Sequence, residues 1–270
     1  MLRAVLWMLL PVLLFAGGCR SGNDTIGGVP RKEKIDSIVS LSPSTTEILL
    51  TQGATQFLKG RTAACNYPDM SVKQIPIVAS VKPDFEKIAT IKPDLVVFDS
   101  AVYNEQDVQK IKELGAQTFT IDADTIDEFT TQLYRLGSVL GLETNVSGYV
   151  DKILAARTSS LGDPISPAPK VAVLLAGWGS AEHMLAGSGS FIADVVRASG
   201  GEPIGPDSDK FETLDPEYLL AQNPDIVVLG VPAKDAAATE RQVAAVLNDG
   251  RFAGMSWVKN RRIIPMDQDV

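Results

Sequence analysis

A pattern of apolar and polar positions occurs twice along the chain. Residues 84–98 read Asp-Phe-Glu-Lys-Ile-Ala-Thr-Ile-Lys-Pro-Asp-Leu-Val-Val-Phe, and residues 215–229 read Asp-Pro-Glu-Tyr-Leu-Leu-Ala-Gln-Asn-Pro-Asp-Ile-Val-Val-Leu. In each copy an Asp that can cap a helix precedes apolar residues at helical spacing, and a Pro-Asp pair then leads into a short apolar run typical of a buried strand. Each copy is half of a β–α–β unit, so the repeat predicts two similar lobes.

The first copy lies among alternating strand and helix patterns. Helical spacing predicts helices at 85–91 and 104–114, and short apolar runs predict strands at 37–41, 75–78, 95–98 and 118–121. Ser44 and Glu47 form a capping box for an earlier helix, and Gly53 is placed to end it. Strands and helices that alternate in this way build a parallel sheet, so the first lobe is predicted to be α/β.

Two helical patterns follow and meet near Gly141. The second would be about 25 Å long at 1.5 Å per residue, which is enough to bridge two lobes. A Pro-rich break then precedes further predicted strands at 170–175, 226–229 and 262–265. The expected organisation is an N-terminal lobe at 36–142, a bridging helix and linker at 143–168, and a C-terminal lobe at 169–270.

The start of the chain has the pattern of an export signal. Arg3 precedes an apolar run from Ala4 to Ala16, which leads through two glycines to Cys19 and is too short to span a bilayer as a mature helix. Residues 1–18 resemble a bacterial lipoprotein signal peptide, in which small residues precede a Cys that becomes lipidated. The alternative is an ordinary secretory signal with an incidental Cys. Either interpretation implies export. We expect a lipid anchor at Cys19 in the cell membrane, facing the periplasm or the outer surface, and a flexible tether at 19–35.

Composition narrows the classes of function. The 270 residues are 45% hydrophobic and 21% charged, which suits one large or two medium globular domains. A formal net charge of −8 leaves no basic surface for phosphates, so nucleic acid is not an expected partner.

The chemistry-bearing residues argue against an enzyme. The chain has one His and two Cys, no Gly-x-Ser-x-Gly motif, and no Gly-x-Gly-x-x-Gly motif after the first strand. With Cys19 lipidated, Cys65 is the one remaining thiol, so an intramolecular disulfide is excluded. We expect Cys65 to pack in the core. A free metal site is disfavoured because His183 has no second histidine to join it. What these residues favour is a protein that binds an organic or chelated ligand.

Several segments, taken in order, resemble one family of exported proteins. They are Ser-Ile-Val-Ser-Leu-Ser-Pro-Ser-Thr-Thr-Glu at 37–47, Gly-Arg-Thr-Ala-Ala-Cys-Asn-Tyr-Pro at 60–68, both Glu-x6-Pro-Asp segments, Leu-Gly-Ser-Val-Leu-Gly at 136–141, Ala-Gly-Ser-Gly-Ser-Phe-Ile at 186–192 and Ser-Gly-Gly at 199–201. Together they are similar to the class III solute-binding proteins of ABC importers, which capture cobalamin, haem or iron-siderophores. The resemblance covers about residues 36–266. It implies an α/β fold of two Rossmann-like lobes with central parallel sheets, joined by one long rigid helix, with the ligand between the lobes.

Ligands of open α/β sheets lie beyond the carboxyl ends of the strands, which selects the candidate loops. Trp178 follows a predicted strand between two glycines, so it either stacks on a flat ligand or packs at the edge of the core. Tyr67 and Tyr103 have the same two interpretations. His183 either coordinates the metal of a bound haem or corrinoid, or is a polar residue of the cleft or surface. The full predicted ligand-binding set is Pro43, Tyr67, Ser80, Val81, Ser100, Tyr103, Trp178, His183 and Phe211.

The predicted ligand is a corrinoid, and the protein is expected to have no cofactor of its own. Cys-Asn-Tyr-Pro at 65–68 is similar to the Cys-Asp-Tyr-Pro of cobalamin-binding members, and Phe211 lies where a corrinoid-stacking aromatic is expected. Ala64, Ser80 and Asp99 depart from the pattern, because these positions are aromatic in the best-known cobalamin binder. Haem and a ferric siderophore stay open as alternatives. An exported redox or metal-cluster enzyme, or a ligand sensor, is a remote one.

The resemblance also implies partners. Glu86 and Glu217 match the exposed glutamates that pair with arginines of the membrane permease. A carboxylate in the first turn of a helix is also favoured by the helix dipole, by about 0.3–1 kcal/mol. The expected partners are a permease dimer with its ATPase subunits, and the protein itself is expected to be a monomer. Family members continue past their last strand into a helix over the second lobe, which this sequence is expected to lack.

Overall fold

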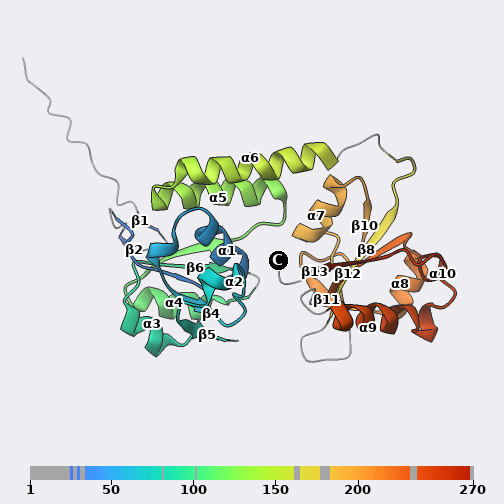
Figure 1. The fold of residues 1–270 in the computed structure, drawn as a ribbon, viewed down its shortest axis with the longest axis horizontal. Helices are drawn as coiled ribbons and strands as arrows, with labels where there is room; N and C mark the ends of the chain where they lie inside the picture. The colour runs from blue at the N-terminus through green and yellow to red at the C-terminus, as the bar shows by residue number, and fades with distance from the viewer. Residues whose placement is uncertain are drawn as a thin grey trace, which may run out of the picture.

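The computed structural model describes residues 25–26, 29–30, 34–80, 82–100, 102–160, 165–176, 183–231 and 236–267. Two α/β lobes lie side by side, and two antiparallel helices run along one edge of the molecule (Figure 1). The predicted signal peptide and Cys19 lie outside the described residues. Within the predicted tether, β1 (Thr25–Ile26) and β2 (Val29–Pro30) pair in antiparallel fashion. None of the helices in the described part of the chain is both long and apolar enough to cross a membrane.

The first lobe has a five-stranded parallel sheet in the order β5-β4-β3-β6-β7. Its strands are β3 (Ile38–Ser40), β4 (Leu58–Thr62), β5 (Ile77–Ala79), β6 (Leu95–Asp99) and β7 (Gln117–Ile121). Successive residues of a strand point to opposite faces. Ile38 therefore packs with Leu49 of the first helix, whereas Val39 packs with Ile88 on the other face. The predicted parallel sheet is confirmed, with β4 as a strand that the hydrophobic pattern missed.

The helices of the first lobe begin and end at recognisable caps. They are α1 (Pro43–Thr51), η1 (Thr55–Phe57), α2 (Asp69–Val72), α3 (Phe85–Ile91) and α4 (Glu105–Glu113). The capping box expected at Ser44 is wrong. Ser42 caps α1 and accepts a hydrogen bond from the Thr45 N–H, because Pro43 suits the first helical position. The helix ends at Thr51, and Gly53 follows at φ +90°, a conformation that favours glycine.

Arg61 explains why β4 was hard to recognise. Its side chain is buried although it is charged, because Nε donates to the carbonyls of Val72 and Ile75 and Nη1 donates to those of Thr62 and Cys65. A charged residue in a buried strand breaks the apolar pattern from which strands are inferred. These bonds fix the loop between β4 and β5. Cys65 in that loop is 1% exposed and packs in the core as expected.

The second lobe has a mixed six-stranded sheet. Its strands are β8 (Lys170–Ala176), β9 (His183–Ala186), β10 (Glu202–Ile204), β11 (Phe211–Thr213), β12 (Ile226–Val231) and β13 (Ile263–Asp267). The strands β8, β12 and β13 form the predicted parallel core of the lobe, and β10 pairs with β8 as a parallel strand that the pattern did not indicate. The β9 and β11 strands are antiparallel additions at the edge, which the pattern did not indicate.

Helices cover both faces of this second sheet. They are α7 (Phe191–Ala198), α8 (Pro216–Gln222), α9 (Ala236–Leu247), η2 (Gly250–Phe252) and α10 (Ser256–Lys259). Val196 of α7 packs against Val171 and Val173, while Leu219 of α8 and Trp257 of α10 pack in a cluster on the opposite face. The predicted repeat corresponds to α3 followed by β6 and α8 followed by β12, so each lobe contains one copy.

The long edge of the molecule is formed by α5 (Ile126–Leu140) and α6 (Glu143–Ser160), separated by the turn at Gly141. Gly141 ends α5 with φ +66°. Gly137 allows the helices to approach closely, because a Cβ there would lie 3.0 Å from Val146. In Figure 1, α6 runs from above the first lobe to above the second. It is the predicted bridging helix.

Candidate functional site

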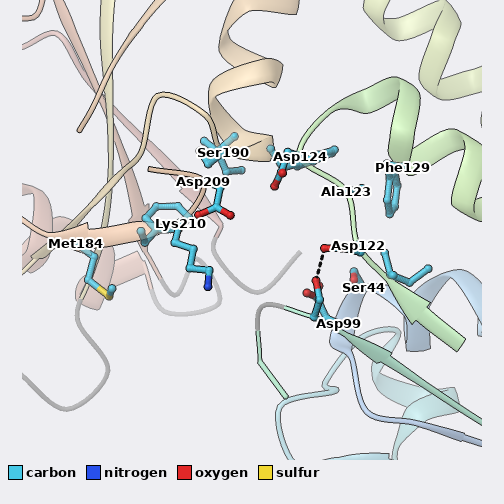
Figure 2. A pocket seen from close by; sticks show the side chains of 15 residues that line it. Ser44, Asp99, Asp122, Ala123, Asp124, Phe129, Met184, Ser190, Asp209 and Lys210 are labelled. Atoms are coloured by element: carbon cyan, nitrogen blue, oxygen red, sulfur yellow. Dashed lines mark hydrogen bonds between the residues drawn. The ribbon is translucent and has the colours of Figure 1, made fainter. Parts of the chain in front are cut away.

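A cavity of about 520 Å³ lies between the lobes (Figure 2). Such a volume is in the range of small-molecule binding sites. Both lobes contribute to its walls. The described residues that line it are Ser44, Asp99, Ser100, Ile121, Asp122, Ala123, Asp124, Phe129, Met184, Ser190, Phe191, Ile192, Asp209, Lys210 and Phe211.

The first lobe faces the cavity with the carboxyl ends of two parallel strands. Asp99 is the last residue of β6 and Ile121 the last of β7, so the residues that follow them lie at the same edge of the sheet. The Ser100 hydroxyl donates to Asp122 Oδ1 over 2.6 Å, a bond drawn as a dashed line in Figure 2. This is the location expected for a ligand of an open α/β sheet.

The second lobe faces the cavity with two loops that lie against each other. The N–H of Gly187 donates to the Lys210 carbonyl and that of Gly189 to the Ser208 carbonyl. Neither Gly187 nor Gly205 has room for a side chain, since a Cβ would lie 2.1 Å from Ser208 O or 1.9 Å from Ala186 O. The first glycine of the Ala-Gly-Ser-Gly-Ser segment is therefore required for the close packing of the two loops. It fixes the 205–210 loop, so that Asp209, Lys210 and Phe211 line the cavity.

The lobes also touch directly beside the cavity. The rings of Phe129 from α5 and Phe191 from α7 meet edge to face, with centroids 5.5 Å apart. Asp194 of α7 accepts a hydrogen bond from the Ile126 N–H over 2.9 Å, at the first residue of α5. A carboxylate from the second lobe thus satisfies a free backbone donor at the start of a helix on the other side. We refer to these four residues as the α5–α7 contact.

The cavity combines apolar surface with negative charge. Phe129, Phe191, Phe211 and Met184 supply the apolar part, whereas four Asp carboxylates and one Lys ammonium give the described lining a formal charge of −3. Partial burial raises the pKa of Asp124, and the negative charges of Asp209, Glu128 and Asp122 raise it further. Since Asp209 belongs to the other lobe, carboxylates of the two lobes act on each other across the cavity.

Two of the sequence-predicted ligand residues, Ser100 and Phe211, line this cavity. Pro43 is exposed at the first position of α1, beside the lining residue Ser44. Tyr67 is 43% exposed, and Ser80 is exposed at the end of β5. These three are not among the residues that line the cavity. Val81 and Trp178 lie outside the described residues.

Tyr103 and His183 lie in other surroundings. Tyr103 is 7% exposed and packs edge to face with Phe98, 6.4 Å between centroids, in the core of the first lobe. His183 lines a second cavity of about 310 Å³ within the second lobe, together with Asp249 and Arg251. Partial burial lowers the pKa of His183. Within the described residues, no group of three or more His, Cys, Asp or Glu side chains is arranged to hold a metal ion.

Sequence reasoning predicted two of the fifteen described lining residues as ligand contacts and missed the others, among them Asp124, Asp209, Phe129 and Phe191. Asp124 follows the predicted strand at 118–121 and could have been found from the rule that ligands lie at strand ends. Asp209 lies two residues before Phe211, which the family resemblance indicated. Phe129 and Phe191 carry no local signal, because their meeting depends on how the lobes are placed.

Glu86 and Glu217 lie at equivalent places in the two copies of the repeat. Each is exposed, and each is in the first turn of its helix, α3 or α8. Asp84 and Asp215 cap these helices through side-chain oxygens that accept backbone N–H bonds. Because Asp84 and Asp215 supply the N-caps, neither glutamate is needed to cap its helix.

Comparison with known proteins agrees with this architecture. The family described as periplasmic binding protein matches residues 38–270. An ABC transporter substrate-binding lipoprotein of Bacillus subtilis (strain 168) is 26% identical over 250 residues, covering 88% of this chain and 75% of the relative. A cobalamin-binding protein of Halobacterium salinarum (strain ATCC 29341 / DSM 671 / R1) is 26% identical, covering 78% of this chain and 58% of the relative.

Solved structures have the same fold. The vitamin B12 binding protein BtuF of Vibrio cholerae has a TM-score of 0.70 at 21% identity, covering 87% of this chain and 89% of that one. The haem-binding protein RhuT from Roseiflexus sp. RS-1 has a TM-score of 0.72 at 24% identity, covering 86% and 89%. These likenesses concern the fold, and the family match extends over most of the sequence. The chain therefore belongs to the periplasmic binding protein family, as a class III solute-binding protein.

Proposed function

We propose that this protein, the substrate-binding component of an ABC importer, captures a corrinoid such as cobalamin between its lobes and delivers it to a membrane permease. The observation that carries the proposal is the lining of the cavity between the lobes, where three phenyl rings and a thioether lie among carboxylates. This lining suits the binding of a ligand with a flat apolar face and polar groups at its edge.

A corrinoid matches both parts of that lining. Its flat macrocycle presents apolar faces to Phe129, Phe191 and Phe211. Its carboxamide arms carry N–H groups, from which the aspartates can accept charge-assisted hydrogen bonds. Relatives named for cobalamin or vitamin B12 binding support the same choice.

Haem is the second candidate, and Met184 is the observation that favours it. A thioether is an axial ligand of haem iron in some proteins, and Met184 lines the cavity. The charge argues the other way, because haem brings two propionates to a lining of formal charge −3. A ferric siderophore stays a third possibility when it is neutral or cationic.

Delivery requires docking to the permease. We propose that Glu86 and Glu217 supply one carboxylate on each lobe for arginines of the permease dimer, on whose ATPase subunits import depends. Their equivalent, exposed positions on α3 and α8 support this role. Export and a lipid anchor at Cys19 would hold the protein at the same membrane as its permease.

Calorimetry tests the ligand. The exported protein, solubilised in mild detergent, is titrated with cyanocobalamin, haem and a ferric hydroxamate. One-to-one binding of cyanocobalamin in preference to the other two is the expected result. Binding of haem or the hydroxamate without cyanocobalamin would keep the importer role and overturn the corrinoid.

A further inference from the structure

Asp124 and Asp209 line the cavity from different lobes. Asp124 lies between β7 and α5 of the first lobe, and Asp209 lies in the 205–210 loop of the second. Figure 2 shows both carboxylates at the cavity, Asp209 next to Lys210 and Asp124 on the segment that also carries Ala123. A ligand seated between the lobes would meet one carboxylate from each.

Both carboxylates are available to a ligand. In the described part of the chain, no hydrogen bond or ion pair joins the side chain of Asp124 or Asp209 to another residue. The neighbouring Asp122 differs, because its Oδ1 already accepts from Ser100. Exposed carboxylates accept hydrogen bonds from water. A ligand that displaces this water without donating hydrogen bonds of its own leaves the carboxylates unsatisfied, which weakens its binding.

The backbone on each side is held in place. On the first lobe, the Asp124 N–H donates to Glu128 and the Ile126 N–H to Asp194. On the second lobe, the bonds from Gly187 and Gly189 fix the loop on either side of Asp209. The two like charges therefore cannot move apart freely, and the raised pKa of Asp124 reflects their mutual repulsion as well as partial burial.

We infer that Asp124 and Asp209 are a specificity-determining pair, which accepts hydrogen bonds from donor-bearing or cationic ligands across both lobes and rejects ligands that bring a carboxylate there. The inference rests on the proposed function and deepens it. It restricts the ligand to a macrocycle or chelate whose edge carries N–H donors, as the carboxamides of a corrinoid do. Lys210 adds one positive charge to the lining, where the described aspartates carry four negative charges.

Monocarboxylic acid derivatives of cyanocobalamin test the pair, because each replaces one carboxamide by a carboxylate with little change of shape. We expect the wild-type protein to bind at least one of them about tenfold more weakly than cyanocobalamin, which is the loss of one charge-assisted hydrogen bond. In D124N, D209N and the double variant this ratio should fall towards one. Asp207→Asn is the matched control, since Asp207 is exposed in the same loop and does not line the cavity.

Two results would overturn the inference. One is equal wild-type affinity for cyanocobalamin and all of its monocarboxylic acids. The other is a ratio that the double variant leaves unchanged, provided that its thermal unfolding matches that of the wild type. Because removing one of two like charges relieves repulsion, neither Asn variant is expected to unfold at lower temperature.

Failure of the proposed function would look different. If cyanocobalamin does not bind at all, the corrinoid proposal fails, and the pair is then tested with haem and its dimethyl ester, which has the same ring without the two propionate charges. Tighter binding of the ester, lost in the double Asn variant, would support the pair. Tighter binding of the free acid would overturn it.

Discussion

Asp94 and Asp225 make equivalent connections in the two lobes. Asp94 Oδ2 accepts from the N–H groups of Asp36 and Ser37, each over 3.0 Å, and Asp225 Oδ2 accepts from the Lys170 N–H over 2.9 Å. Each aspartate also donates its own N–H to a carbonyl there, Ser37 O or Lys170 O, over 2.8 Å. The Pro-Asp of each repeat thus ties the start of β6 or β12 to the start of the adjacent central strand.

Alanine at either aspartate should destabilise its lobe by about 1–3 kcal/mol, because a hydrogen bond from a partly buried backbone N–H to a charged carboxylate is lost. Urea unfolding measures the loss, and the two losses should add because the sites lie in separate lobes. Asp207→Ala, an exposed aspartate outside both repeats, serves as control. A loss of stability no larger than that of the control would contradict the stabilising role of Asp94 and Asp225.

The α5–α7 contact should limit movement between the lobes. Asp194→Ala removes the acceptor for the Ile126 N–H, and Phe191→Leu removes one ring of the aromatic pair. We expect the double variant to broaden the distance distribution between spin labels at Thr90→Cys and Lys259→Cys. Both label positions are exposed, one in each lobe, and buried Cys65 should not react.

The control for that experiment is Asp127→Ala. It removes a carboxylate from the same helix, but its partner is Arg157 of α6, at 2.7 Å, so the link between lobes through α7 is kept. A distribution as narrow in the double variant as in this control would show that the bridging helix alone fixes the lobes.

Replacing Glu86 and Glu217 together by Ala should abolish ligand uptake by cells and leave ligand affinity unchanged. Both side chains are exposed at helix starts and lie outside the cavity lining, so their loss affects docking only. Glu113 and Glu240, also exposed, form the control pair. Weaker ligand binding by the variant, or unimpaired uptake, would argue against docking.

His183 predicts a dependence of stability on pH. Burial lowers the pKa of His183 in the folded protein below the usual 6.5. Below about pH 6.5 the unfolded chain therefore binds more protons than the folded one, and stability falls as the pH falls through this window. His183 is the single histidine of the sequence, so His183→Asn should remove the dependence. The test is the urea midpoint of each protein between about pH 7.5 and 5.5. If the assignment is wrong, the midpoints of the wild type and of the His183→Asn variant will change by the same amount over this range.

Local pattern was sufficient for the elements that carry a continuous apolar face. The helix predicted at 85–91 has the bounds of α3, and the strands predicted at 95–98 and 226–229 lie within β6 and β12. It was insufficient for β4, where buried Arg61 interrupts the run, and for β11, where only three residues pair with β9.

The candidate site was also predictable only in part. The rule that ligands lie at strand ends led to Ser100, and the family resemblance led to Phe211. Neither could show that Phe129 meets Phe191 or that Asp124 faces the same cavity as Asp209. Each of those pairs joins residues of different lobes that are distant in sequence, so their meeting depends on how α5 and α6 place the lobes.

The placement of α5, α6 and α7 has one further consequence. In the described part of the chain, the bridging helix and the α5–α7 contact join the lobes along the same edge of the molecule (Figure 1). Rotation about an axis along this edge would widen the cavity mouth at the far side without stretching the backbone or breaking the edge contacts. Ligand exchange would then require a small angular change about one axis, and solution scattering should detect little compaction when ligand binds.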